Sequence, residues 1–286
     1  MRYKSADSYY RGRFGKKMYR VSLDIGTTCP NRDGTRGTGG CIFCSAGGSG
    51  EFALSHDDID NAIARVSRKA GEGAGYLAYF QSYTGTYCDV SYLKKCIDEV
   101  MAHPKIEGVI IATRPDAIPD DILELLASYN KEFPVFVELG LQTASDVTAE
   151  KINRCYKTEE FVAAVARLHK HNIHVTAHVI IGLPGESPDD MMDTVKLVVD
   201  TGCEGIKFTA LYVLRGTVLA DMYGRGEFEV LSMDEYFDII DRALDLIPDG
   251  MTVFRLTGDG PKNLMIAPLW TNNKRAVINY INRRFG

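Results

Sequence analysis

The sequence predicts an α/β fold: an open, partial β/α barrel of about six parallel strands with helices outside. Through the middle of the 286-residue chain, segments rich in β-branched and aromatic residues alternate with segments of helical periodicity. Such alternation is typical of parallel strands joined by right-handed crossovers. About six such units are too few for a closed eight-stranded barrel. Basic N- and C-terminal extensions flank this predicted barrel.

Local patterns place the individual elements. The segments with strand character are Tyr19–Ile25, Tyr76–Gln81, Gly108–Ala112, Val135–Leu141, Ile173–Ile181, Gly205–Leu214 and Thr252–Leu256. The segments with helical patterns are His56–Ala70, Val90–Ala102, Pro119–Tyr129, Thr158–His171, Pro188–Asp200 and Met233–Leu246. Acidic pairs lie in the first turns of three of these helices, where the helix dipole favours them: Asp57 and Asp58, Asp120 and Asp121, and Glu159 and Glu160.

Charge is segregated along the chain, although the net charge is only −5. Residues 1–20 carry a net charge of +6, residues 262–286 carry +5, and the middle is left with −16. We expect a basic N-terminal extension (1–18), a barrel domain (19–260) and a basic C-terminal helix packed on that domain (261–286). Two basic ends on an acidic body favour a phosphate-rich partner, with solubilisation alone as the alternative.

Composition argues against several classes of protein. Hydrophobic residues make up 45% of the chain, enough for a sizeable core. No apolar run approaches the ~20 residues of a membrane span. The N-terminus has no apolar signal region, and seven cysteines, an odd number, argue against a disulfide framework. We therefore expect a cytoplasmic protein without a membrane partner.

Three cysteines, Cys29, Cys41 and Cys44, form a C-x11-C-x2-C segment on the loop after the first predicted strand. Three thiolates can hold three irons of a [4Fe–4S] cluster and leave the fourth iron open, whereas a closed structural zinc site needs four ligands. His56 is the nearby candidate for a fourth zinc ligand, but it begins a helical pattern. We interpret the Gly-rich run 31–40 as a flexible loop around the cluster.

This segment resembles the cluster loop of the radical S-adenosylmethionine (radical SAM) enzymes, whose commonest spacing is C-x3-C-x2-C. The long first gap, the run Cys-Pro-Asn-Arg-Asp-Gly at 29–34 and the basic, Tyr-rich segment Tyr9–Leu23 before it are similar to the YhcC/YtqA-like subfamily. The resemblance implies the radical SAM fold and two cofactors, a [4Fe–4S] cluster and SAM. Cys29, Cys41 and Cys44 would ligate three irons, and the methionyl amine and carboxylate of SAM would chelate the fourth.

The resemblance also implies SAM contacts. Phe43, just before the last cysteine, would pack near the adenine. The stretches 140–143 and 152–154 resemble oxygen-independent coproporphyrinogen oxidase and the Elp3-like enzymes, so Gln142 would contact the nucleoside or methionyl part and Arg154 the carboxylate. His178 falls where that group has an Asp contacting the ribose, and Gly182 would let the backbone approach the adenine.

Each of these residues also has a structural interpretation: core packing for Phe43, a surface charge for Arg154, a structural role for His178 and a strand-ending turn at Gly182. The family's Gly-Gly-Glu motif after the second strand is replaced by residues 81–87, which are rich in Tyr and Thr. The remaining cysteines lack the spacing of a second cluster, and we interpret them as packed or incidental: Cys88, Cys96, Cys155 and Cys203.

Strand parity predicts a polar lumen, because alternate residues of a strand share one face. The polar faces of three neighbouring strands carry His174, Thr176 and His178; Glu138, Gly140 and Gln142; and Lys207 and Thr209. Hydrogen bonding between strands could explain one such face. Three together favour a ligand site.

The resemblance finally implies a function. It points to the MnmL type of enzyme, which modifies the tRNA wobble uridine by converting the 5-carboxymethylaminomethyl group to 5-aminomethyl. The implied partners are tRNA and an electron donor such as flavodoxin or ferredoxin, which would allow release of a 5′-deoxyadenosyl radical from SAM. The alternatives are a radical SAM enzyme acting on a small molecule or peptide and, with less support, a zinc-stabilised RNA-binding protein without catalysis.

Overall fold

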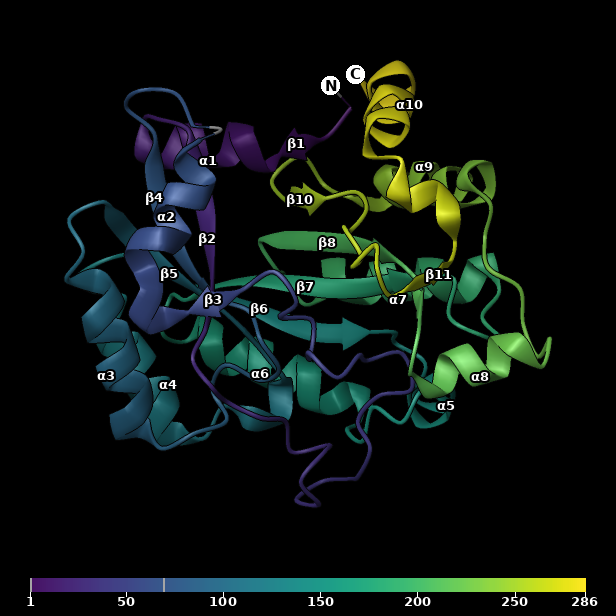
Figure 1. The fold of residues 1–286 in the computed structure, drawn as a ribbon, viewed down its shortest axis with the longest axis horizontal. Helices are drawn as coiled ribbons and strands as arrows, with labels where there is room; N and C mark the ends of the chain where they lie inside the picture. Colours follow the sequence, from purple (N-terminus) through teal and green to yellow (C-terminus); the bar gives the residue numbers. More distant parts are fainter. Residues whose placement is uncertain (1, 69) are drawn as a thin grey trace.

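The computed structural model describes residues 2–68 and 70–286. Residue 1 of the predicted N-terminal extension and residue 69 of the predicted helix His56–Ala70 lie outside the described residues. One parallel sheet has the strand order β1-β10-β8-β7-β6-β5-β4-β2-β3 (Figure 1). Its strands are β1 (Lys4–Ser5), β2 (Met18–Asp24), β3 (Leu54–Ser55), β4 (Gly75–Phe80), β5 (Ile106–Thr113), β6 (Val135–Gln142), β7 (His174–Ile181), β8 (Gly205–Ala210) and β10 (Thr252–Arg255). The predicted open, partial barrel of parallel strands is confirmed.

Helices cover the outside of the sheet and fill the connections between its strands (Figure 1). They are α1 (Ala6–Phe14), α2 (Ile59–Ser67), α3 (Val90–Met101), α4 (Asp120–Tyr129), α5 (Asp146–Lys151), α6 (Thr158–His169), α7 (Pro188–Asp200), α8 (Val218–Gly224), α9 (Met233–Leu246) and α10 (Lys274–Phe285). Short 3-10 turns occupy His56–Asp58, Pro115–Ala117 and Leu269–Asn272. The six predicted helices correspond to α2, α3, α4, α6, α7 and α9.

Two predicted elements differ from the structure. The predicted strand Gly205–Leu214 is divided, because β8 ends at Ala210 and the short β9 (Val213–Leu214) pairs antiparallel with β11 (Met265–Ala267) in a separate sheet. The predicted helix His56–Ala70 begins with a 3-10 turn and ends as α2 at Ser67. Strand character continues across the break at residues 211–212, so local pattern does not show that the strand changes sheets.

The two faces of the sheet differ as the parity predicted. On β7, Val175, Ala177 and Val179 are buried in the core that the outer helices cover. The alternate residues His174, Thr176 and His178 face the other way, into the barrel. The apolar face therefore anchors the helices, and the polar face is left for the lumen.

Helix α1 packs over the lumen near the amino ends of the strands. Its Tyr10 is buried in a cluster with Tyr79, Phe136 and Phe254 from three strands, and Tyr9 lies edge-on to Phe136 with ring centroids 6.4 Å apart. Since α1 occupies this end of the barrel, the lumen is accessible from the carboxyl ends of the strands, where ligand sites of parallel sheets lie.

The basic termini meet the acidic helix α9 (Figure 1). Arg284 of α10 pairs with Asp238 at 2.7 Å and with Asp241 at 3.1 Å, and Arg2 pairs with Asp241. The rings of Phe237 and Tyr280 stack with centroids 4.9 Å apart. Part of the terminal charge is therefore neutralised within the chain. Among the described residues, no helix has both the length and the apolar character to cross a membrane.

Candidate functional site

The long gap between Cys29 and Cys41 is a closed hairpin, which corrects the expected flexible loop. The backbone N–H of Gly40 donates to the carbonyl oxygen of Asn31 at 2.8 Å, and Asp33 and Thr38 form an antiparallel bridge. Residues 32–39 therefore form a loop whose two ends, Asn31 and Gly40, lie side by side. Without them, Cys29, Pro30 and Asn31 continue into Gly40 and Cys41, which is the spacing C-x3-C-x2-C.

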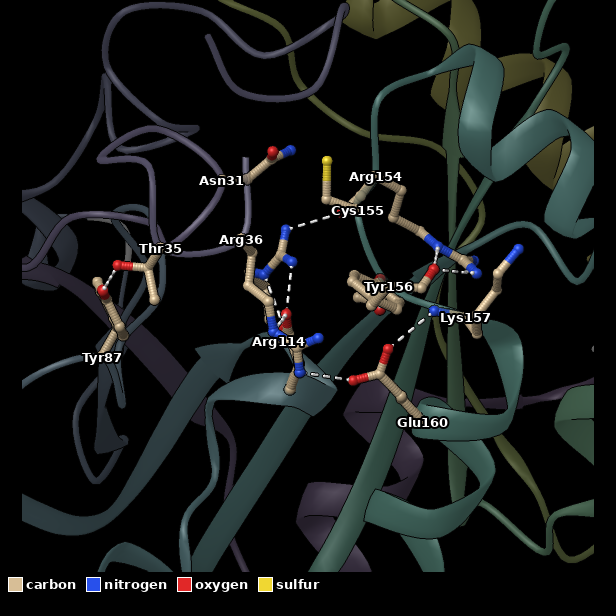
Figure 2. Close-up of polar contacts among 12 residues, drawn as sticks. Asn31, Thr35, Arg36, Tyr87, Arg114, Arg154, Cys155, Tyr156, Lys157 and Glu160 are labelled. Atoms are coloured by element: carbon tan, nitrogen blue, oxygen red, sulfur yellow. Dashed lines mark hydrogen bonds and ion pairs between the residues drawn. The ribbon is translucent and has the colours of Figure 1, made fainter. Parts of the chain in front are cut away.

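Side-chain contacts hold this hairpin against neighbouring loops (Figure 2). Arg36 pairs with Glu160 of α6 at 2.8 Å and with Asp116 at 3.5 Å, and the hydroxyls of Thr35 and Tyr87 are 2.7 Å apart. The loops after β4 and β5 and the start of α6 thus fix its outer end. The hairpin is therefore held in place at the edge of the site.

Residues at the hairpin's base turn back to the cysteines. Nη2 of Arg32 donates to the carbonyl oxygen of Ser45 at 2.6 Å and to that of Cys44 at 3.2 Å. Nδ2 of Asn31 lies 3.6 Å from Sγ of Cys41. Hydrogen bonds to ligating sulfurs tune the potential of an iron–sulfur cluster, which gives Asn31 a physical reason to follow Cys29, while Arg32 fixes the backbone at Cys44 and Ser45.

One cavity collects most of the predicted site residues. Cys29, Cys41 and Cys44 line it together with Phe43, Gln142, Arg154 and His178. It lies where the loops after β2, β4 and β6 meet the polar face of the strands. Residues distant in the sequence thus form a single site at the carboxyl edge, as the parallel topology predicts.

The three cysteines fit a cluster better than a single ion. Their thiols lie near enough to influence one another electrostatically, and burial, with the neighbouring Cys44, raises the pKa of Cys41 to about 12. Among the described residues, however, their sulfurs do not gather within 4.8 Å of one another. A tetrahedral zinc with Zn–S of ~2.3 Å would bring them to roughly 3.8 Å. Iron binding must also displace the thiol protons.

His56 does not complete a zinc site with these cysteines. Its Nε2 lies 3.3 Å from a carboxylate oxygen of Asp57 and 3.3 Å from one of Glu99, and 3.6 Å from Sγ of Cys96. It is therefore engaged at the start of α2, beside α3. His56 is therefore not the fourth ligand that the alternative of a zinc site with the three cysteines requires.

Gln142 is placed to contact a ligand. It ends β6 with φ of +68°, a left-handed conformation that is uncommon outside glycine and marks functional sites. Within the described part of the chain, its side-chain amide has no hydrogen-bond partner in the structure, and it faces the cavity. The loop that replaces Gly-Gly-Glu also lines the cavity, and there Thr84 has a buried hydroxyl without a partner.

Arg154 binds the backbone on both sides of Gln142 and so stabilises the left-handed conformation of that residue. Its Nη1 donates to the carbonyl oxygens of Leu141 and Thr143, both at 2.6 Å. Nε donates to Tyr156 O at 3.2 Å (Figure 2), and Nη2 donates to Thr158 Oγ1 at 3.1 Å. The side chain is 1% exposed, not the surface charge of the alternative interpretation. All five N–H groups are engaged, so none is free for the carboxylate contact that the resemblance implied.

His178 belongs to a buried network in the lumen. Its Nε2 lies 2.7 Å from a carboxylate oxygen of Glu138, which also accepts from the Tyr79 hydroxyl at 2.8 Å and from Lys207 Nζ. Burial opposes ionisation of Glu138, but the charges of Lys207 and Arg20 and the bond from His178 hold its pKa well below the usual range. Burial lowers the pKa of His178 to about 4, so the ring is neutral.

Gly182 is not among the residues that line the cavity, and its expected contact with the adenine stays a prediction. A Cβ on this residue would lie 3.1 Å from Leu231 Cδ1, and its φ is +93°. The glycine is needed because the chain turns in the left-handed region at the end of β7. This is the turn that the alternative interpretation predicted.

Several lining residues were missed by the sequence analysis: Arg32, Tyr79, Arg114, Tyr212 and Arg255. Two signals could have pointed to some of them. Arg32 lies within the cysteine motif, and Arg255 is the last residue but one of the predicted strand Thr252–Leu256, just before the run Gly258-Asp259-Gly260-Pro261. A glycine-rich turn after a parallel strand is a common ligand contact.

Comparison with known proteins establishes the family. The model of the radical SAM superfamily matches residues 25–198, and that of the Radical_SAM C-terminal domain matches residues 203–285. The chain belongs to the radical SAM superfamily. It is a radical SAM enzyme and uses a [4Fe–4S] cluster and SAM as cofactors.

Two relatives of this radical SAM enzyme cover nearly all of it. Uncharacterized protein YtqA of Bacillus subtilis is 43% identical over 286 residues, 99% of this chain and 89% of that protein. Protein YhcC of Escherichia coli is 33% identical over 92% of this chain and 85% of that protein. The resemblance to the YhcC/YtqA-like subfamily is thereby confirmed.

The archaeal Elp3 of Methanocaldococcus infernus has a similar fold. Its structure, which lacks the N-terminus, superposes with a TM-score of 0.69 at 18% identity, over 94% of this chain and 63% of the Elp3 chain. At this identity the likeness supports the radical SAM fold alone. The comparison covers less than two thirds of the Elp3 chain.

We predict that Cys41→Ala abolishes cluster binding. Anaerobically reconstituted wild-type protein should hold about four irons per chain, as one [4Fe–4S] unit requires, and iron analysis should show that the variant loses them together with SAM cleavage. Cys155→Ser is the matched control, because Cys155 donates to Asn153 Oδ1 at 3.2 Å and is not one of the three proposed ligands. One zinc per chain, with no iron after anaerobic purification, would contradict this prediction.

We also predict that His178 makes stability depend on pH. Its pKa in the fold is about 4, below the ordinary value of 6.5, so the unfolded chain takes up this proton first as the pH falls. Stability is therefore lost between pH 6.5 and pH 4, by about 2 kcal/mol from pH 7 to pH 5. Urea unfolding of metal-free protein should show that His178→Gln removes this loss. The exposed His171→Gln should leave it unchanged, and equal slopes for wild type and His178→Gln would refute the assignment.

Proposed function

We propose that this protein is a cytoplasmic radical SAM enzyme that acts on the tRNA wobble uridine. Abstraction of a hydrogen atom from the carboxymethyl methylene beside nitrogen in a 5-carboxymethylaminomethyl group would give a carbon radical, which would return one electron to the oxidised cluster and become an imine. Water would then hydrolyse the imine, release the carboxymethyl part as glyoxylate and leave 5-aminomethyl, with SAM reduced to methionine and 5′-deoxyadenosine. The observation that carries the proposal is a single cavity that contains three cysteines at one rim and a charged, hydrogen-bonded network at its base. Such a site combines a place for the cofactors with a polar place for a substrate.

The chain's residues have distinct roles in this proposal. Cys29, Cys41 and Cys44 hold the cluster, while Phe43 and Gln142 position SAM from the wall of the cavity. Bound there and reduced by a donor such as flavodoxin or ferredoxin, the cofactors supply a 5′-deoxyadenosyl radical able to abstract hydrogen from an unactivated carbon.

Similarity to a tRNA-modifying enzyme supports tRNA as the substrate. The tRNA-2-methylthio-N(6)-dimethylallyladenosine synthase of Ehrlichia canis is 32% identical over 143 residues, 49% of this chain and 30% of that protein. The C-terminal basic segment adds physical support. Lys262 and Arg275 are exposed near the Gly258–Pro261 turn that lines the cavity, and Lys274 pairs with Asp259 in that turn at 2.7 Å.

The reaction can be tested directly. Reconstituted enzyme, SAM, reductant and tRNA bearing 5-carboxymethylaminomethyluridine should yield 5-aminomethyluridine and 5′-deoxyadenosine, both measured by mass spectrometry of nucleosides. Cys41→Ala should form neither product. Release of 5′-deoxyadenosine with unchanged tRNA, and with turnover of a small molecule or peptide instead, would replace this function with the alternative one.

We predict that the two basic ends contribute unequally to tRNA binding. Lys262→Gln with Arg275→Gln removes charges near the cavity rim, so affinity should fall and the salt slope should flatten by roughly 1.4–1.8 for two phosphate contacts. The matched control, Arg11→Gln with Arg13→Gln, changes helix α1 at the other end of the barrel and should leave both quantities unchanged. Fluorescence anisotropy over a range of salt concentrations measures this difference. Equal effects of the two pairs would refute the assignment of the rim.

A further inference from the structure

Arg255, at the end of β10, is a cavity cation that has no anionic partner among the described residues. Its Nε donates to the carbonyl oxygen of Phe208 at 3.3 Å, and its Nη2 donates to Thr209 Oγ1. These two bonds fix the orientation of the guanidinium. Within residues 2–68 and 70–286, no hydrogen-bond acceptor meets its Nη1 and no carboxylate lies within 4 Å of the group.

The acids that could neutralise Arg255 are already engaged. Glu138 is saturated by Tyr79, His178 and Lys207. Asp259, which also lines the cavity, pairs with Lys274 at 2.7 Å. The guanidinium is therefore not paired with a carboxylate of the described residues, and it lies in a partly buried place where an anion that enters the cavity would be attracted strongly.

Tyr212 adds a second donor beside this cation. Its buried hydroxyl makes no hydrogen bond of normal geometry with the described residues, although the Thr257 hydroxyl and the Gly258 backbone lie beside it. Burial raises its pKa to about 12, with the charge of Arg255 opposing the shift, so the group stays protonated and can donate. A Cβ on Gly258 would lie 2.7 Å from this hydroxyl, so a glycine there leaves the hydroxyl uncrowded. Buried donors in proteins normally have a hydrogen-bond acceptor, and the Tyr212 hydroxyl has none of normal geometry among the described residues.

We propose that Arg255 and Tyr212 form a subsite for a carboxylate of the substrate. Two donors that line one cavity, one charged and one neutral, suit the two oxygens of a carboxylate. This inference rests on the proposed function, which supplies a carboxylate at the end of the carboxymethylaminomethyl group. The subsite would hold the part of the side chain that the reaction removes.

The placement distinguishes this subsite from that of SAM. Arg255 is at the carboxyl end of β10, on a different strand from the one that leads into the cysteine loop. The cysteines follow β2, and the methionyl carboxylate of SAM belongs at the cluster that they hold. Arg32 and Arg154, the cations beside the cysteine loop and Gln142, already donate to backbone carbonyls. The methionyl carboxylate would chelate the open iron of the cluster, so it is not the anion that Arg255 lacks.

The test compares two anticodon stem-loop RNAs that share every phosphate. The wobble uridine of one carries 5-carboxymethylaminomethyl, and that of the other carries 5-methylaminomethyl, which lacks only the carboxylate. Anaerobic holoenzyme with SAM and no reductant should bind the first about ten-fold or more tightly. Arg255→Gln should bring this ratio close to one, and Tyr212→Phe should reduce it by about five-fold. Arg275→Gln, at the rim, should weaken both RNAs equally and keep the ratio.

Iron content and SAM affinity should stay unchanged in Arg255→Gln and Tyr212→Phe, which shows that these variants are folded. A wild-type ratio near one would overturn the subsite. An equal loss for both RNAs in Arg255→Gln would assign Arg255 to an RNA phosphate, and a loss of SAM affinity would assign it to the methionyl carboxylate. Preference without conversion of tRNA would keep the subsite and remove the proposed reaction, whereas conversion without preference would remove the subsite alone.

Discussion

The interior of the barrel depends on one buried carboxylate. Glu138 of β6 accepts hydrogen bonds from Tyr79 of β4, His178 of β7 and Lys207 of β8, and Arg20 of β2 lies 3.9 Å away. An unpaired charge at this depth would be strongly destabilising, so these partners must be present together. Their mutual requirement fixes the polar faces of neighbouring strands toward one another and gives the cavity a rigid, charged base.

Much of the architecture could be predicted because it depends on local periodicity. The alternation of strands and helices predicted parallel strands. The positions of His178 and Glu138 in their strands predicted that both side chains face the lumen, as the structure shows. Helix α1 was missed because its apolar residues do not form a clear amphipathic stripe, and it is held by tertiary contacts of Tyr9 and Tyr10. The division of the strand Gly205–Leu214 depends on pairing with β11, which is remote in sequence.

The site was predictable to a different degree. Three closely spaced cysteines indicated a cluster, since thiolate number alone limits the choice of metal. The direction of a long side chain is not encoded by motif position, and this limited the inference for Arg154. Its guanidinium reaches carbonyls of the β6–α6 connection. No motif singles out Arg255. Its importance depends on contacts between other residues, because Glu138 and Asp259 are already paired with lysines and leave Arg255 without a carboxylate.

The hairpin at residues 32–39 bears on how metal-binding patterns are recognised. A pattern that counts residues treats the long gap as a different motif, whereas the backbone bond between Gly40 and Asn31 makes the two ends neighbours. The entropic cost of bringing Cys29 to Cys41 is paid when that bond closes the loop, and it grows only logarithmically with the length of the segment. Insertions of other lengths at the same two residues would preserve the geometry, so this loop is a position where related chains can diverge while the metal chemistry stays constant.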